Sequence, residues 1–221
     1  MNVARVTVTR KPSIALISTG DELVLPGETP NEDQIIASNT YGLKAMLDAE
    51  GAEARILPIA KDNVPSLTTA FELAQDSDMI VTIGGASVGD HDLVADVAET
   101  RGLRRAFYKI RMRPGKPLMA GKMGNKPMVG LPGNPVSAMV CGKVFLLPML
   151  RVMQGFPGQA APRSSARLAK DIGKNGPREH YLRAIVENGE ITPAERQDSS
   201  LLSVLARSNA LMIRAPEARP R

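Results

Sequence analysis

The first two-thirds of the chain alternates short apolar runs with amphipathic segments. The runs at 13–18 ("SIALIS") and 79–85 ("MIVTIGG") have the length and composition of buried strands. The run at 53–59 ("EARILPI") has the same character. Helical spacing of apolar residues predicts helices at 40–51, 64–76 and 92–102. This order predicts a three-layer α/β domain, in which helices cover both faces of a mostly parallel sheet.

Beyond the third predicted helix the pattern changes to shorter strands. The segment 116–131 predicts two strands joined through the turn-prone pair Gly124-Asn125. A helix is then predicted at 135–147, with Asn134 at its N-cap.

The segment 155–165 ("GFPGQAAPRSS") has the Pro/Gly/Ser composition of a linker. We therefore predict two domains, 1–157 and 158–221. In the second, 179–193 suggests a β-hairpin and 201–214 a short helix followed by a strand. The C-terminal part is expected to be a small β-rich domain.

Charge and composition narrow the class of partner. The 221 residues carry a net charge of +5, which favours an anionic ligand. Aromatic residues make up only 3% of the chain, and no zinc-finger or RNP motif occurs, so nucleic acid is not expected and a small anion is favoured. No apolar run approaches the roughly 20 residues that span a bilayer, and residues 1–10 alternate like a strand without the apolar core of an export signal. One cysteine excludes an internal disulfide framework, so we expect a cytoplasmic protein without membrane contact.

Three polar loops follow predicted strands: 18–23 ("STGDEL"), 60–63 ("AKDN") and 84–92 ("GGASVGDHD"). In an open parallel sheet, ligands collect beyond the carboxyl ends of the strands. The acidic residues of these loops are Asp21, Glu22, Asp62, Asp90 and Asp92. Each alone is typical of a solvated loop, but together at one sheet edge they would repel unless a cation such as Mg²⁺ lay among them.

Two turns framed by proline and glycine supply positive groups. In "MRPGKP", Arg113 and Lys116 flank a stiff Pro-Gly pair. In "GLPGNPVSAM", a helix start offers backbone N–H groups and the hydroxyl of Ser137 to an anion. A solvent-exposed basic turn remains the alternative for the first stretch. Cys141 is interpreted as a core residue, and His91 and His180 are too few for a zinc site.

The stretches "STGDEL", "GGASVGDHD", "MRPGKP" and "GLPGNPVSAM" occur in a distinctive order and spacing. Together they resemble the molybdopterin molybdenumtransferase family, which includes MoeA and the gephyrin E-domain. The resemblance covers roughly 11–156, and "DSSLLSVLARSNAL" at 198–211 is similar to the family's C-terminal domain. It implies the molybdopterin-binding fold, which molybdopterin adenylyltransferases share.

The family's reaction joins molybdate to adenylylated molybdopterin, releasing AMP and yielding molybdenum cofactor. The resemblance therefore implies these two anionic substrates, Mg²⁺, a homodimer and the molybdopterin adenylyltransferase as a partner. Two alternatives stay open: an adenylyltransferase-like enzyme that uses the same domain, and a non-catalytic molybdopterin-binding or scaffold module.

The resemblance also implies roles for individual residues. The catalytic set is Glu22, Asp62, Asp92, Lys109, Arg113 and Lys116. Its three acidic members would hold the metal and serve the phosphoanhydride, and its three basic members would stabilise negative charge. The substrate-binding set is Thr19, Gly20, Asp21, Gly84, Gly85, Ser87, Gly89, Pro117, Pro132, Gly133, Asn134, Pro135, Ser137, Arg183 and Ser208.

The chain departs from the family pattern in two ways. Arg113 stands where relatives often carry lysine, which keeps the charge but changes geometry and hydration. Family enzymes also carry two further domains ahead of this region, and the dimer partner's N-terminal part completes the active site. We therefore expect the 221-residue chain to bind ligand but to turn over poorly.

Overall fold

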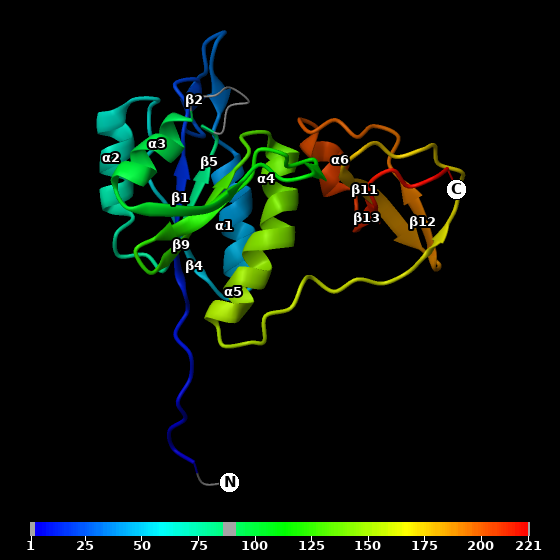
Figure 1. The fold of residues 1–221 in the computed structure, drawn as a ribbon, viewed down its shortest axis with the longest axis horizontal. Coiled ribbons are helices and arrows are strands. Elements are labelled where there is room, and N and C mark those ends of the chain that lie inside the picture. The colour runs from blue at the N-terminus through cyan, green and yellow to red at the C-terminus, as the bar shows by residue number, and fades with distance from the viewer. Residues whose placement is uncertain (1–2, 86–91, 221) are drawn as a thin grey trace.

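A six-stranded sheet with the order β4-β1-β5-β9-β8-β6 forms the first unit of this computed structural model, which describes residues 3–85 and 92–220 (Figure 1). Its strands are β1 (Ser13–Ser18), β4 (Glu53–Ile56), β5 (Met79–Ile83), β6 (Leu103–Tyr108), β8 (Met119–Met123) and β9 (Lys126–Leu131). The neighbours from β4 to β9 are parallel, and β8 and β6 add antiparallel pairs at one edge. The mostly parallel sheet expected from the sequence is confirmed.

Helices cover both faces of this sheet because its central strands are apolar on both sides. Ile14 and Leu16 of β1 join one core, and Ala15 and Ile17 join a second core on the opposite face. The helices are α1 (Asn39–Ala49), α2 (Val64–Leu73), α3 (Leu93–Thr100), α4 (Pro135–Cys141), the π-helical η1 (Gly142–Leu146) and α5 (Leu147–Met153). The first core is shared with α1, α4 and α5, and the second with α2 and α3, so the three-layer prediction is confirmed (Figure 1).

The prediction that no apolar run approaches the length of a membrane span was wrong, because the helical stretch Pro135–Met153 is apolar and long enough to cross a membrane by length and composition alone. In the fold it packs against α1, and its side chains Val140 and Leu150 are buried in the first core. The close approach of this stretch to α1 depends on glycine, because a Cβ on Gly142 would lie 2.7 Å from Cδ2 of Leu43 in α1. Burial against the sheet accounts for the apolar composition of this helix.

A second sheet is built mainly from the C-terminal part of the chain. Its elements are β10 (Arg167–Leu168), β11 (Glu179–Glu187), β12 (Glu190–Pro193), α6 (Leu202–Ala206) and β13 (Ala210–Arg214). The predicted hairpin at 179–193 is confirmed, because β11 and β12 pair antiparallel. It turns at Asn188 and Gly189, whose φ angles are 52° and 81°. The C-terminal part is therefore β-rich, as expected.

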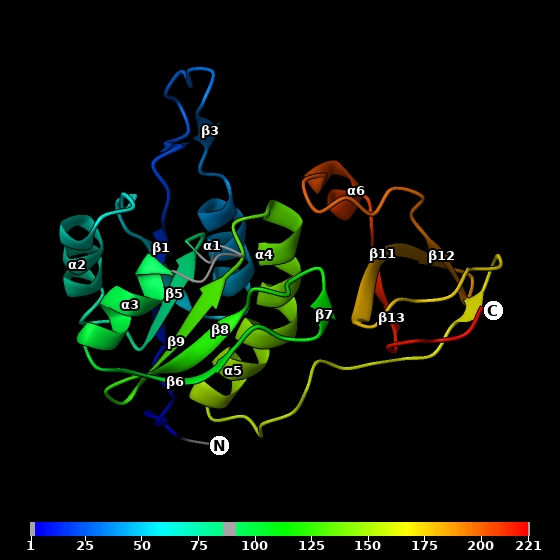
Figure 2. The ribbon, with the colours of Figure 1, turned by 45° about the horizontal axis from the view of Figure 1, so that its top comes forward.

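The two sheets are joined by a strand that the first unit contributes to the second. β7 (Met112–Arg113) pairs in parallel with β11, so that Arg113 is the register partner of His180. Figure 2 shows β7 between α4 and the strands β11 and β13. Tyr181 of β11 is buried in the first core. The division at 157/158 stays a prediction, since the two parts that it separates share a sheet.

Two local predictions were wrong. Ser38, not Asn39, is the N-cap of α1, and the side-chain amide of Asn39 instead donates to the carbonyl of Gly133 at 2.7 Å. The strand-like residues 3–10 pair with no described strand, and their valines are exposed. Asn134 does occupy the N-cap position of α4, although its side chain makes no capping hydrogen bond.

Replacing Gly142 with valine should lower the free energy of unfolding by about 1–3 kcal/mol, the usual cost of overpacking a closed core. The branched side chain would enter the space that Leu43 and Met46 of α1 occupy. Gly173→Val is the matched control, because a Cβ at that position meets no atom within 4 Å. Urea denaturation followed by circular dichroism measures both variants. Equal midpoints would contradict the helix packing described above.

Candidate functional site

The loops that follow β1, β4, β5 and β9 meet at one edge of the main sheet. The amide of Thr19 donates to the carbonyl of Ile83 at 3.0 Å, and the amide of Gly20 donates to the carbonyl of Ala60 at 3.1 Å. The amide of Gly84 donates to the last residue of β9 at 3.1 Å. These bonds hold the four loops together at the carboxyl ends of parallel strands, where open α/β sheets bind ligands.

Glycine is required where these loops touch. A Cβ on Gly84 would lie 2.5 Å from the carbonyl oxygen of Thr19, and a Cβ on Gly85 would lie 2.3 Å from a valine methyl of α3. The Thr19 hydroxyl beside them is buried and has no hydrogen-bond partner among the described residues. The structure brings Thr19, Gly84 and Gly85 together, while the predicted Ser87 and Gly89 lie outside the described residues.

Three carboxylates lie close together in the acidic loops at this edge. The amide of Asp62 donates to Oδ1 of Asp21 at 3.2 Å. Burial raises the pKa of Asp62, and the negative charges of Asp21 and Glu22 raise it further. A hard cation would offset this repulsion. Within 3–85 and 92–220, however, no group of three or more His, Cys, Asp or Glu residues is placed to hold a metal ion, so the fit to Mg²⁺ is partial.

Asp92, the third predicted metal ligand, has structural partners of its own. Its Oδ1 accepts a hydrogen bond of 3.0 Å from the amide of Ala95, which makes Asp92 the N-cap of α3. Burial raises the pKa of its carboxyl group, which also accepts a hydrogen bond from the Tyr108 hydroxyl. The ammonium of Lys109 lies 4.8 Å from the centre of the Tyr108 ring. Asp92, Tyr108 and Lys109 thus form a continuous chain of contacts.

The first turn of α4 is less open to an anion than the sequence suggests. The amide of Val136 donates to the carbonyl of Ser199 at 3.0 Å, so the second unit already occupies this N–H group. The prediction of free backbone donors at this helix start is therefore wrong for Val136. Five predicted residues lie in or directly before this turn: Pro132, Gly133, Asn134, Pro135 and the buried Ser137.

Residues 109–118 form the basic turn, closed by two backbone hydrogen bonds. The amide of Lys109 donates to the carbonyl of Leu118 at 2.9 Å, and the amide of Ile110 donates to the carbonyl of Lys116 at 2.9 Å. Lys109 itself has a φ of 66°, an uncommon conformation for a residue with a side chain. Pro117, from the predicted substrate-binding set, lies within the same turn.

The basic turn rests on the side of α4. Gly115 has a φ of 111°, and a Cβ on it would lie 2.5 Å from Sγ of Cys141. Cys141 lies six residues after Pro135, so the turn contacts α4 about 9 Å along the helix from its first residue. Burial raises the pKa of the Cys141 thiol to about 12. Arg113 and Lys116, on either side of this contact, are exposed and can reach an anion.

Arg183 of β11 is fully buried, yet only part of its guanidinium is bonded. Nη2 donates to the carbonyl of Asp198 at 3.0 Å, whereas Nε and Nη1 have no hydrogen-bond partner in the part of the chain that the structure describes. Burial lowers the pKa of Arg183, the negative charge of Asp198 opposes this shift, and the positive charge of Arg113 adds to it. An anion is the natural partner for such a group. The hydroxyl of Ser208, predicted to act with Arg183, donates to the carbonyl of Val204 at 2.8 Å.

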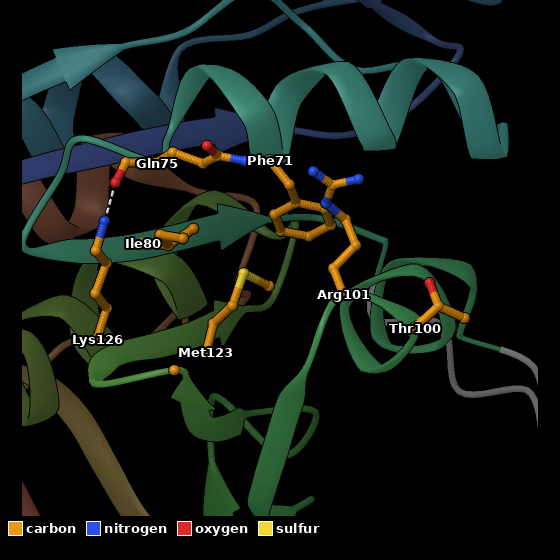
Figure 3. Close-up of a pocket in the computed structure, with 8 residues that line it drawn as sticks. Phe71, Gln75, Ile80, Thr100, Arg101, Met123 and Lys126 are labelled. Carbon is orange, nitrogen blue, oxygen red and sulfur yellow. Dashed lines mark hydrogen bonds between the residues drawn. The ribbon is translucent and has the colours of Figure 1, made fainter.

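Figure 3 shows a pocket of about 390 Å³ whose lining residues include none of the predicted site residues. Phe71 and Ile80 contribute apolar side chains, and Arg101 and Lys126 contribute positive charges. Ile80 belongs to the amino-terminal end of β5, and Lys126 donates to the carbonyl of Gln75, just beyond α2. Lys126 thus offsets the carbonyl end of α2, and Arg101 forms an ion pair of 3.2 Å with Glu72 of the same helix, so both cations have structural roles.

Sequence reasoning missed Tyr108 and underrated Cys141. Tyr108 directly precedes the predicted Lys109, but its bond to Asp92 depends on tertiary structure and leaves no mark in the sequence. Cys141 was interpreted as a core residue, which is correct, but its contact with Gly115 also fixes the position of the basic turn.

Two family models match most of this chain. A probable molybdopterin binding domain matches residues 15–152, and the MoeA C-terminal region (domain IV) matches residues 165–220. The chain belongs to the molybdopterin molybdenumtransferase (MoeA) family. The resemblance on which the sequence analysis drew is therefore confirmed.

Relatives of this MoeA-family chain are similar to it in sequence and in fold. Molybdopterin molybdenumtransferase 2 of Mycobacterium tuberculosis (strain CDC 1551 / Oshkosh) and the molybdopterin molybdenumtransferase of Haemophilus influenzae are each 34% identical to it, over 96% of this chain and 54% of their own length. A molybdopterin biosynthesis MoeA protein from Pyrococcus horikosii has a TM-score of 0.80 and 29% identity, covering 96% of this chain and 51% of that one. The chain thus spans about half the length of the curated relatives that it matches.

Gly115→Ala in this MoeA-family chain should weaken binding of a tetrahedral oxyanion about tenfold, because the added methyl group collides with Cys141 and displaces Lys116. Gly124→Ala is the matched control: it also loses a glycine at positive φ, but its Cβ meets no atom within 4 Å. Adding Cys141→Ala to Gly115→Ala removes the sulfur and should restore part of the affinity. Calorimetry with sulfate as the oxyanion measures all three variants. Equal losses in Gly115→Ala and Gly124→Ala would show that the Cys141 contact is irrelevant.

Proposed function

We propose that this chain forms the substrate-binding part of a molybdopterin molybdenumtransferase, which joins molybdate to adenylylated molybdopterin and releases AMP. The observation that carries the proposal is the buried guanidinium of Arg183, two of whose nitrogens are unbonded among the described residues. β7 pairs directly with β11, the strand that carries Arg183, and this brings the basic turn next to that strand. We call the junction of β7, the basic turn and β11 the joint. Relatives named molybdopterin molybdenumtransferase support the assignment.

Molybdate is the anion that we place at this joint. Within residues 3–85 and 92–220, no carboxylate forms an ion pair with Arg113, Lys116 or Arg183. The positive charges of Arg113 and Arg183 disfavour each other unless a counter-ion offsets them, and a tetrahedral dianion supplies that charge. Lys109 and Lys116 then stabilise the negative charge that develops on the departing phosphate.

The loops at the carboxyl edge bind the nucleotide-bearing ligand in this proposal. The hydroxyl of Thr19 donates to a phosphate oxygen, and Gly84 and Gly85 allow the ligand to approach the backbone closely. The basic turn lies about 9 Å along α4 from the first residue of that helix, so one extended ligand can contact both regions. Molybdopterin therefore lies across the first turn of α4.

A divalent cation belongs to the same proposal. Glu22 and Asp62, with Asp21 beside them, would hold Mg²⁺ through carboxylate oxygens, and the resemblance adds Asp92 as a third ligand. The repulsion that raises the pKa of Asp62 supports a cation among the first three carboxylates. Bound there, Mg²⁺ would supply charge neutralisation for the ligand's pyrophosphate.

An adenylyltransferase-like enzyme and a non-catalytic binding module are the alternative functions for this fold. The match of 165–220 to the MoeA C-terminal region favours the transferase. The homodimer, contact with the molybdopterin adenylyltransferase and a cytoplasmic location also remain parts of the proposal.

Lys116→Ala should weaken molybdate binding by about 1.5–3 kcal/mol, the range for a hydrogen bond to a charged group. Arg113→Lys keeps the charge but loses the planar fork, so its loss should be smaller. Lys122→Ala removes an exposed lysine of β8 away from the basic turn and is the control. Calorimetry with molybdate compares the affinities. If Lys116→Ala binds as tightly as the parent chain, the basic turn is only a solvated loop.

Molybdate-dependent release of AMP from adenylylated molybdopterin is the activity that tests the proposal. The 221-residue chain should bind the adenylylated ligand but turn it over slowly, because it spans about half the length of the relatives named molybdopterin molybdenumtransferase. Chromatography of AMP with and without molybdate measures turnover. Formation of adenylylated molybdopterin from molybdopterin and ATP would instead show an adenylyltransferase, and binding with no turnover even after the preceding domains are supplied would show a pure binder.

A further inference from the structure

His180 lies in the middle of a group of arginines on the second sheet. Its strand β11 is flanked by β7 and β13, and its register partners on these strands are Arg113 and Arg214. Register partners on neighbouring strands project from the same face, so Arg113 and Arg214 flank the imidazole on one face of the sheet. Arg178 lies directly before the first residue of β11, and its positive charge also acts on His180. We call His180 and these three arginines the His180 face.

The imidazole is buried without a full set of hydrogen bonds. The His180 side chain belongs to a residue that is only 8% exposed, and its Nε2 has no partner among the described residues. Burial lowers the pKa of His180 to about 4, and the positive charges of Arg113, Arg183, Arg178 and Arg214 contribute in that order. At neutral pH the ring is therefore uncharged, although it lies among cations.

Neighbouring carboxylates do not neutralise the His180 face in the part of the chain that the structure describes. No ion pair there involves Arg113, Arg178 or Arg214. Glu179 alternates to the opposite face of β11 and accepts from the Tyr181 hydroxyl at 2.6 Å.

The arginines themselves are bonded weakly or to uncharged groups. Arg178 donates to the carbonyl of Met112 at 3.5 Å, and Arg214 donates to backbone carbonyls that include that of Arg219, at 2.8 Å. Among the described residues, the guanidinium of Arg113 has no hydrogen-bond partner. Asp198, on the segment beyond β12, bonds to Ser200 instead. The face therefore carries excess positive charge and one unused imidazole nitrogen.

We propose that a tetrahedral oxyanion or a terminal phosphate group binds on the His180 face, and that His180 takes up a proton as the anion binds. The anion offsets the arginine charges that disfavour an imidazolium, and the protonated ring gains a charge-assisted hydrogen bond through Nε2. The inference deepens the proposed function and rests on it, because Arg113 is common to both sites. It makes His180 a ligand-binding residue, a role that nothing in the sequence analysis assigned to it.

The coupling between anion and proton has a definite sign. In the free protein His180 is neutral above pH 4 or so, because its pKa is about 4. Binding of the anion raises that pKa. At any pH between the pKa of His180 in the free protein and its pKa in the complex, each binding event therefore takes up a proton. Affinity then rises as the pH falls through this window, by at most about tenfold per pH unit for one proton. Without ligand the same acidification destabilises the fold, because the unfolded chain binds the proton more tightly.

Calorimetry in buffers of different ionisation enthalpy at pH 6 counts the protons taken up. The probes are sulfate, molybdate and AMP, each titrated into the full chain and into His180→Gln. Sulfate stays a dianion over this range, so any proton must come to the protein. Uptake with sulfate and molybdate identifies a free oxyanion as the ligand, and uptake with AMP alone identifies a phosphate ester. The phosphate of AMP itself titrates near the same pH. The proton uptake on AMP binding is therefore taken as the difference between the parent chain and His180→Gln.

The expected result is uptake of up to one proton by the parent chain and none by His180→Gln. The affinity of the variant at pH 6 should be about three- to tenfold lower than that of the parent chain. Imidazole NMR provides a second measurement on the parent chain alone, which has only two histidines. Sulfate should move one imidazole pKa upward from about 4. This measurement decides the matter if His180→Gln does not fold.

Two outcomes would overturn the inference, and they differ in what they leave standing. Binding of molybdate that depends on Lys116, with no proton uptake and no imidazole shift, refutes the role of His180 but leaves the proposed function intact. Failure of all three probes to bind the parent chain refutes the His180 face and the proposed molybdate site together.

Discussion

The pairing of β7 with β11 is the interaction on which the candidate site depends. The paired segment of β7 is only two residues long, yet it fixes the basic turn against the strand that carries His180 and Arg183. The amide of Glu179 donates to the carbonyl of Arg111 at 2.9 Å, which extends the contact by one residue. The bond from Val136 to Ser199 holds the first turn of α4 against the same unit. A site between two units can in this way have a rigid backbone.

The site separates two charges that would otherwise neutralise each other. Acidic loops lie beyond β1 and β4, whereas the basic turn and the buried Arg183 lie at the joint. The basic turn contacts α4 at Cys141, about 9 Å along the helix from its first residue. Under the proposed function, the metal-bound pyrophosphate of one substrate and molybdate as the other would match these two regions. The charge of each region would then be offset by a substrate.

Periodicity was sufficient to predict most of the main sheet and both hairpins. β1 and β5 are short, mainly apolar runs, and the turns at 124–125 and 188–189 contain Asn and Gly, so these elements are encoded locally. β7 could not be predicted, since two residues give no periodicity and their partner lies more than sixty positions away in the chain. The same long separation in sequence explains why the prediction of a free backbone N–H group at Val136 was wrong. Its N–H group looked free because the carbonyl of Ser199 that occupies it belongs to a distant segment.

The contact between Gly115 and Cys141 gives the joint a built-in reporter. Cys141 is the one cysteine of the chain, it is buried, and its thiol has a pKa of about 12, so the reactive thiolate is scarce in the closed fold. A thiol reagent can reach this sulfur only when the basic turn lifts from α4 or when the helix itself opens. The rate of modification therefore measures the free energy of that opening, site-specifically and without an added label. An anion that holds the turn closed slows the reaction, so the same sulfur records how strongly ligand binding stiffens the joint.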